Sequence, residues 1–160
     1  MGYITAKEVA AKGFHTVLAC RDELRGKEAE AALQRDNPAG SFEFRQLDLA
    51  DLASVSDFCK ATLDAGKGID LLVNNAGVMA TPEMETKDGF EFQLGVNHLG
   101  HFALTGQLYP LLSEADRCAL LSGKRCVLSY KRVCRKARMC IIASAAHLWA
   151  NLKLTGVHKT

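Results

Sequence analysis

Short apolar segments alternate with longer amphipathic ones along this 160-residue chain, and the alternation limits the folds that are open to it. The short segments are β-branched or continuously apolar, as buried strands are, and the longer ones repeat apolar residues at helical spacing. The expected strands cover residues 15–21, 41–49, 69–73 and 140–143, and the expected helices cover residues 22–37, 51–68 and 90–112. Such a pattern predicts right-handed strand–helix–strand units, and therefore an α/β fold with a doubly wound parallel sheet.

Local signals support the expected helices. Asp22 is placed to cap the first of them, and Pro110 is expected to kink or restart the third. In the second helix the residues of one face recur at intervals of three, four, seven and eight, as they do in an amphipathic helix. These residues are Val55, Phe58, Cys59, Thr62 and Leu63.

Length and composition indicate one soluble domain, with 48% hydrophobic and 24% charged residues. No run approaches the roughly 18 consecutive apolar residues of a membrane span. The opening residues "MGYITAKEVAAKG" lack the apolar core of a secretory signal. Six cysteines form no CxxC pair, so reduced thiols are favoured over disulfides or zinc ligands. These features predict a cytoplasmic protein without a bound metal.

Charge is divided unevenly along the chain. Residues 1–116 contain 10 Lys/Arg and 18 Asp/Glu, whereas residues 117–160 contain 10 Lys/Arg and no acid. Residues 118–137 interrupt the strand–helix rhythm and are interpreted as a basic insertion, either a lineage-specific loop or a translated intron. Like charges without nearby acids predict an exposed segment that the fold can spare. One aromatic residue and no known motif in this stretch do not favour nucleic-acid binding.

In a doubly wound sheet, ligands bind at the carboxyl ends of the strands. The expected strand ends read "ACR", "LDL", "NNAG" and "ASAAH". In the third, the small residues Ala76 and Gly77 would let a ligand approach the backbone closely. Taken alone, "NNAG" is better interpreted as an ordinary turn, because Asn and Gly both favour turns.

Taken together, the strand ends and the stretch "DLLVNNAGVMATPEMETKDGFEFQLGVNHLGHFALT" resemble the short-chain dehydrogenase/reductase family, in its retinol-dehydrogenase-like and WW-domain-oxidoreductase-like branch. The resemblance covers residues 2–117 and 139–150. It implies a Rossmann-like dinucleotide-binding domain that passes a hydride between NAD(P)(H) and a carbonyl or alcohol. The implied substrate is small and hydrophobic.

The resemblance implies cofactor contacts at five positions. Asp48 would hydrogen-bond the adenine, and Asn74, Ala76 and Gly77 would line the adenine ribose and steady the central strand. Gly2 would correspond to the last glycine of the turn with which the family holds the pyrophosphate.

Arg21 follows the second family strand, where the 2′ position of the adenosine lies. An arginine there can pair with a 2′-phosphate, so NADP(H) is the expected cofactor, with NAD(H) as the alternative. Arg21 can also be interpreted as a solvated surface charge. Asp22 beside it weakens the argument, because an acid at this position would suit the ribose hydroxyls of NAD.

The resemblance also implies two catalytic positions. Asn97 matches an asparagine that holds a water in the proton relay, and Ser144 matches the serine that hydrogen-bonds the substrate carbonyl oxygen. A polar helix residue and a strand-end serine are the ordinary alternatives. The family's general acid/base lies in a Tyr-x-x-x-Lys after the serine, but residues 145–160 contain no tyrosine. Tyr3 and Lys7 have the spacing but belong to the first helix, so they are interpreted as a decoy.

Other residues in the same region are expected to serve packing. His98 and His101 are three residues apart without a third ligand at metal spacing, so roles in packing or on the helix surface are favoured. Gly95, Gly100 and Gly106 are expected to let a helix pack closely against its neighbours.

The family's first strand, which is central in its sheet, has no counterpart here, and neither have its C-terminal strands. Residues 1–160 are therefore expected to form a partial dinucleotide-binding domain with two open sheet edges, which could pair in an oligomer. Two functions stay open. One is an NADP(H)-dependent oxidoreductase that is incomplete and inactive as written; the other is a non-catalytic product that binds a nucleotide or a partner chain.

Overall fold

The computed structural model describes residues 2–118, 125–127 and 138–141, with side chains described through residue 112. In chain order the elements are α1 (Gly2–Ala10), β1 (His15–Cys20), α2 (Glu23–Asp36), β2 (Ser41–Gln46), α3 (Leu52–Asp64), β3 (Leu71–Asn74), α4 (Phe92–Leu94), η1 (Gly95–Gly100), α5 (His101–Cys118), β4 (Arg125–Val127) and β5 (Arg138–Ile141). No helix within these residues is long and apolar enough to cross a lipid bilayer.

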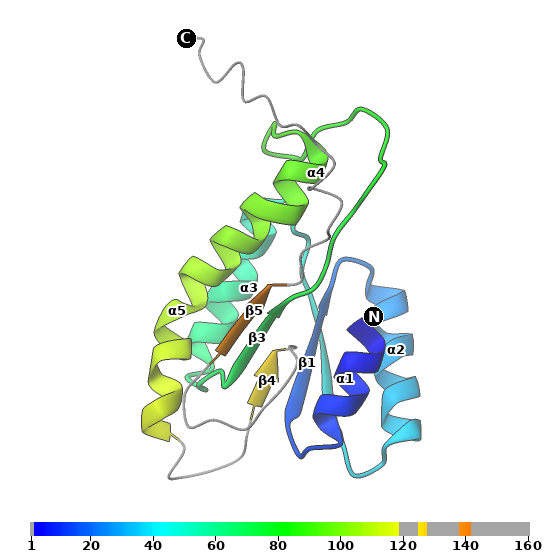
Figure 1. Cartoon of the computed structure of the whole chain (residues 1–160), viewed down its shortest axis with the longest axis vertical. Helices are drawn as coiled ribbons and strands as arrows, with labels where there is room; N and C mark the ends of the chain where they lie inside the picture. The colour runs from blue at the N-terminus through cyan, green and yellow to red at the C-terminus, as the bar shows by residue number, and fades with distance from the viewer. Residues whose placement is uncertain (1, 119–124, 128–137, 142–160) are drawn as a thin grey trace.

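The strands form one parallel sheet in the order β2-β1-β4-β3-β5. Figure 1 shows α1 and α2 on one face of this sheet and α3 and α5 on the other. Helices on both faces of a parallel sheet are the arrangement that the strand–helix alternation predicts. The α/β class with parallel strands is confirmed.

Each face of the sheet has its own hydrophobic core. The smaller cluster belongs to the face that α1 and α2 cover and consists of Ala6, Ala10, Leu18, Leu33 and Phe42. The larger cluster belongs to the opposite face and includes Val55, Phe58, Cys59, Leu72, Val96, Leu104 and Leu108. The apolar face predicted for α3 is confirmed at its first three positions, which are buried.

Capping aspartates define where α2 and α3 begin. Asp22 accepts a hydrogen bond from the Arg25 N–H at 3.0 Å, which confirms its predicted role as an N-cap. Asp51 caps α3 by accepting from the N–H groups of Ala53 at 2.9 Å and Ser54 at 3.3 Å. Such caps typically stabilise a helix by about 1 kcal/mol.

The single helix predicted over 90–112 is wrong in detail. It begins as α4, widens into the π-helical segment η1, and continues as α5, which contains Pro110 and does not restart there. A π segment widens the helical turn and changes which side chains face a neighbour. Pro110 lies on the exposed side of α5, where water can bind the carbonyl oxygen that its missing N–H leaves free.

Close packing explains two of the three glycines in this region. A Cβ at Gly95 would collide with the Thr86 methyl group, and one at Gly100 would lie 2.5 Å from the Leu49 carbonyl oxygen. Nothing lies within 4 Å of a Cβ placed on Gly106. The packing role predicted for the glycines is therefore confirmed at Gly95 and Gly100 and wrong at Gly106.

The predicted open edges in the middle of the sheet are also wrong. Strand β4 comes from the basic stretch 118–137 and lies between β1 and β3. Cys126 pairs with Thr16 on one side and with Leu71 on the other. An unpaired strand edge attracts any extended segment that can reach it, and residues 125–127 fill this one. Three residues of the stretch interpreted as an exposed insertion are therefore part of the sheet.

The last strand begins two residues before its predicted start. Strand β5 covers Arg138–Ile141, two residues earlier than the predicted strand over 140–143, and residues 142 and 143 lie outside the described chain. It pairs in parallel with all of β3, so Asn74 lies opposite Ile141.

Candidate functional site

The predicted cofactor residues come from one edge of the sheet. Arg21 follows β1, Asp48 lies just beyond β2, and Asn74 is the last residue of β3. Because β1, β2 and β3 are parallel, their carboxyl ends meet at the same edge (Figure 1). Gly2, the first residue of α1, lies against the segment that follows β3, because a Cβ on Gly2 would be 3.0 Å from Asn75 Nδ2.

Asn97 lies against the same segment from the helix side. Its Nδ2 donates to the Val78 carbonyl oxygen at 2.8 Å, and its Oδ1 accepts from the Val78 N–H at 2.8 Å. A Cβ on Gly77 would be 3.3 Å from Asn97 Oδ1. The amide keeps a second N–H and a second lone pair. The structure therefore brings Gly2, Gly77 and Asn97 together around residues 75–78.

The buried end of β3 is held by hydrogen bonds to α5. Asn74 Nδ2 lies 3.0 Å from Thr105 Oγ1, and Asn74 Oδ1 lies 3.2 Å from His101 Nδ1. The other ring nitrogen of His101, Nε2, lies 2.8 Å from the Ala76 carbonyl oxygen. Burial lowers the pKa of His101, and the hydrogen bond to Ala76 opposes this shift.

The two histidines were predicted to serve packing or the helix surface, and the structure shows one of each. His101 is buried and hydrogen-bonded to the β3 end, whereas His98 is exposed and its ring stacks on Phe102 with centroids 6.3 Å apart. The described part of the chain contains no cluster of residues that could hold a metal ion. The contact between His101 and Ala76 was missed; its signal was a histidine four residues after Asn97, on the same side of the helix.

Asp48 lies in a hydrogen-bonded turn. Its Oδ1 accepts from the Ala50 N–H at 2.9 Å, and its own N–H donates to Ser54 Oγ at 3.0 Å. Asp48 is half-buried. These contacts hold the carboxylate at the end of β2.

The side chains of Arg21 and Asp22 have different contacts. The carboxylate of Asp22 caps α2 and lies 3.6 Å from Arg25 Nε. The side chain of Arg21 is exposed, and among the described residues it has no ion pair or hydrogen bond. The guanidinium of Arg21 is therefore available to an anion, while Asp22 is engaged in its own helix.

Two remaining predictions concern catalysis. Ser144 lies outside the described residues. In the Tyr3–Lys7 pair, Lys7 Nζ binds Asp36 Oδ2 at 2.8 Å, and this contact ties α1 to the far end of α2. The interpretation of this pair as a decoy agrees with that contact, because the ammonium group of Lys7 is engaged by Asp36.

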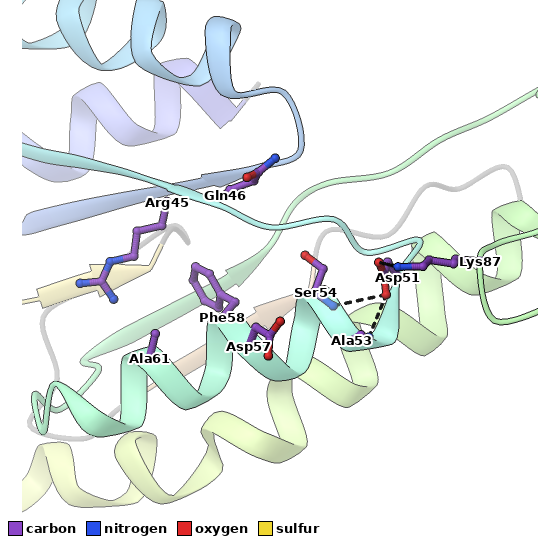
Figure 2. Close-up of a pocket in the computed structure, with 9 residues that line it drawn as sticks. All are labelled: Arg45, Gln46, Asp51, Ala53, Ser54, Asp57, Phe58, Ala61 and Lys87. Carbon is purple, nitrogen blue, oxygen red and sulfur yellow. Dashed lines mark hydrogen bonds and ion pairs between the residues drawn. The ribbon is translucent and has the colours of Figure 1, made fainter.

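A hollow of about 530 Å³ lies elsewhere, between α3 and the end of β2 (Figure 2). Its lining includes Arg45, Ser54, Phe58 and the ion pair of Lys87 Nζ with Asp51 Oδ2, which are 2.6 Å apart. None of the predicted site residues lines it. The hollow adjoins the candidate site through Asp48, whose N–H donates to the lining residue Ser54.

Sequence comparisons match this chain to one dehydrogenase family and to several named dehydrogenases. The sequence model of the family described as short chain dehydrogenase matches residues 1–121. Human retinol dehydrogenase 14 is 40% identical over 139 residues, and bovine (Bos taurus) retinol dehydrogenase 12 is 44% identical over 115 residues. These matches cover 78% and 72% of this chain, and 41% and 36% of the relatives. Mouse polyprenol dehydrogenase is 38% identical over 158 residues, which is 99% of this chain and 43% of the relative. The chain thus spans about two fifths of the length of these curated relatives.

Solved structures share the fold. A crystal structure of an uncharacterized protein from Mycobacterium Paratuberculosis has a TM-score of 0.60 at 48% identity, covering 68% of this chain and 37% of that one. A metagenomic short-chain oxidoreductase in complex with NADP has a TM-score of 0.60 at 25% identity, covering 72% of this chain and 52% of that one. Both matches support a Rossmann-like arrangement.

Proposed function

The chain belongs to the short-chain dehydrogenase family, and from this premise we propose that it forms the cofactor-binding part of an NADP(H)-dependent oxidoreductase acting on a hydrophobic alcohol or carbonyl. One observation carries the proposal. Gly2 at the start of α1, residues 75–77 after β3, and Asn97 on η1 meet at the edge where three parallel strands end.

The residues present fit a dinucleotide at this edge. The first turn of α1 carries the positive end of the helix dipole, which favours a pyrophosphate. Glycine at position 2 leaves room there, because a side chain would press on Asn75. Ala76 and Gly77 are exposed and have little side chain, so the adenine ribose could lie against their backbone.

The preference for NADP(H) rests on Arg21. Its exposed guanidinium follows β1 and is free of ion pairs among the described residues, so it can form charge-assisted hydrogen bonds with a 2′-phosphate. Asp48 would meet the adenine from the neighbouring strand end, because hydrogen bonds hold its carboxylate there.

The proposed substrate class rests on the relatives and on one loop. The relatives are named as dehydrogenases of retinol and of polyprenol, which are both apolar alcohols. In this chain Met79 and Met84 follow the candidate site in an extended loop and are 75% and 44% exposed. Exposed methionines offer an adaptable apolar surface. Such a surface supports a hydrophobic substrate.

The bound cofactor would supply the hydride to a carbonyl or accept it from an alcohol, and this chain's residues would orient the reacting groups. Asn97 would hold a water with its second N–H, and Ser144 would hydrogen-bond the substrate oxygen. Residues 145–160 provide no tyrosine for proton transfer. The second candidate function, cofactor binding without turnover, is therefore the one proposed for the 160-residue chain by itself.

The direct test is cofactor binding by the purified chain, followed by calorimetry. We expect NADPH to bind more tightly than NADH, and Arg21→Asp to weaken NADPH binding by about 10- to 100-fold, as the loss of a charged hydrogen bond does. Arg35→Asp makes the same charge change in the last turn of α2, at its opposite end, and should leave the affinity unchanged.

The same samples test turnover. With NADP⁺ and retinol, the 160-residue chain should produce no NADPH absorbance above that of the buffer. A folded chain that binds neither cofactor would contradict the proposed function. Turnover that Ser144→Ala abolishes would contradict the proposal of binding without catalysis.

A further inference from the structure

Three polar side chains on one side of the η1–α5 helix contact alternate residues of the segment that follows β3. Asn97 bonds the backbone of Val78, and His101 bonds the carbonyl oxygen of Ala76. Thr105 bonds the side chain of Asn74. We call this set of contacts the polar ladder.

The ladder follows from a match between two backbone repeats. Residues 97, 101 and 105 are four apart on the helix, and their partners at 78, 76 and 74 are two apart in an extended segment. Between His101 and Thr105, four residues of the α-helix rise about 6 Å, which matches about 6.6 Å for two residues of an extended segment; the step from Asn97 to His101 crosses the wider turn of η1. The two segments run in opposite directions, so each step down one matches a step up the other. Asn75, between two rungs, contacts Gly2 instead.

The central rung requires a particular protonation of His101. The ring is buried and burial lowers its pKa, so it is neutral and has one N–H. Only Nε2–H can donate to the Ala76 carbonyl oxygen at 2.8 Å, which leaves Nδ1 as an acceptor. The structure has Asn74 Oδ1, a second acceptor, at 3.2 Å from Nδ1. Exchanging the oxygen and nitrogen of the Asn74 amide would put the Nδ2 donor there, and amide orientations are assigned from the hydrogen bonds around them.

This orientation completes a chain of hydrogen bonds with a single direction. With the amide exchanged, the Thr105 hydroxyl would donate to Asn74 Oδ1, Asn74 Nδ2 would donate to His101 Nδ1, and His101 Nε2 would donate to the Ala76 oxygen. Each donor meets an acceptor, whereas the opposite orientation of the amide places two acceptors against each other. A buried network satisfied in this way holds its members rigidly.

We propose that His101, as the Nε2–H tautomer, is a positioning residue that holds residues 74–78 on the helix and so presents Asn75, Ala76 and Gly77 to the cofactor. The part that concerns the cofactor rests on the proposed function. The part that concerns the segment stands on the ladder alone.

The tautomer is tested on the unaltered chain by NMR with ¹⁵N-labelled histidine. We expect the His101 ring to show a protonated Nε2 and an unprotonated Nδ1 at pH 7.5. A ring protonated at Nδ1 only, or at both nitrogens, would overturn the inference. This measurement needs no variant and no cofactor.

The positioning role is tested with His101→Phe, which fills the site without hydrogen bonds, and with His101→Gln, whose amide N–H can replace the bond to Ala76. His98→Phe is the matched control, because His98 is exposed and lies one turn away. In His101→Phe the N–H groups of residues 75–78 should exchange with solvent about tenfold faster, and His101→Gln should restore part of the protection. Unchanged exchange in a folded His101→Phe would overturn the positioning role.

Cofactor binding then separates the two proposals. We expect His101→Phe to bind NADPH about tenfold more weakly, with partial rescue by His101→Gln and no change in His98→Phe. Equal affinity in all three variants would overturn the cofactor part of the inference. An unaltered chain that shows the expected tautomer and exchange but binds no NADPH would contradict only the proposed function.

Discussion

At the scale of single residues, Gly100 offers the sharpest test of packing. A Cβ there would lie 2.5 Å from the Leu49 carbonyl oxygen, and backbone cannot give way as a flexible side chain can. We expect Gly100→Ala to lower the free energy of unfolding by about 1–3 kcal/mol, the usual cost of overpacking. Urea unfolding followed by circular dichroism measures it.

The control for Gly100→Ala is a substitution at Gly106 in α5. Gly106 is exposed in α5 and has nothing within 4 Å of a Cβ. Gly106→Ala should therefore stabilise the chain, by up to about 1 kcal/mol of helix propensity. If the two substitutions have the same effect, the close approach of η1 to Leu49 is wrong.

His101 predicts a dependence of stability on pH. Burial lowers its pKa in the folded chain, and the atoms that face its ring, from Asn74 and Ala76, carry no charge. Above its ordinary pKa of 6.5 the ring is neutral in both states. As the pH falls below 6.5, the unfolded chain takes up the proton first, so the free energy of unfolding should decrease until the folded ring is protonated too.

Carboxylates contribute in a different range of pH. Hydrogen bonds from Arg45 and Lys87 hold the pKa values of Glu43 and Asp51 below their ordinary 4.5 and 3.8. Their contributions to stability are therefore lost only at lower pH.

The dependence on His101 is measured by urea titrations at pH 7.5, 6.5 and 5.5. The free energy of unfolding should decline as the pH falls in the unaltered chain, and His101→Gln should make this decline smaller. Equal slopes in both chains would contradict the prediction.

At the scale of elements, β4 carries the largest difference between expectation and structure. Its residue Cys126 pairs with both neighbouring strands, although the surrounding stretch was expected to be dispensable. We expect Cys126→Pro to destabilise the chain, because proline cannot donate a ladder hydrogen bond in a central strand. Cys126→Ala keeps the N–H and should be closer to the unaltered chain in urea unfolding.

The deletion of residues 118–137 extends this test. If the stretch were only an exposed insertion, its removal would leave stability unchanged or improve it. With β4 between β1 and β3, the deletion should reduce the stability and expose two strand edges, which should appear as aggregation in light scattering. A stable, monomeric deletion variant would show that the sheet does not depend on β4.

At the scale of the whole molecule, cofactor binding should stabilise the fold. A ligand at about 100 times its Kd stabilises the folded state by about 2.7 kcal/mol. For a domain of this size each kcal/mol raises Tm by about 2–4 °C, so NADPH should raise it by several degrees. NADH at the same concentration should give a smaller shift, and Arg21→Asp should remove the difference. Equal shifts for both cofactors would contradict the role of Arg21.

Local signals in the sequence were sufficient for much of the fold and part of the site. The cap at Asp22 and the apolar face beginning at Val55 depend on residues a few positions apart, so they are legible in sequence. Gly77 could be placed at the site because parallel strands end at a common edge, whereas Gly2 and Asn97 were placed there by the resemblance to the family. His101 was not placed there, because its partner at Ala76 is 25 residues away and its spacing of four residues from Asn97 does not by itself identify that partner.

By itself, then, the sequence determined the strand–helix alternation, the parallel α/β class and the family, because periodicity, caps and motifs are properties of short segments. Tertiary structure alone decided which strand occupies the middle of the sheet, where η1 widens, and which side chains form the polar ladder. Three residues, "RCV", have no signature that marks them as a central strand. Their place depends on backbone hydrogen bonds to two strands that are more than 50 residues away. Any extended segment can compete for an unpaired strand edge, so no pattern within a short segment identifies the one that fills it.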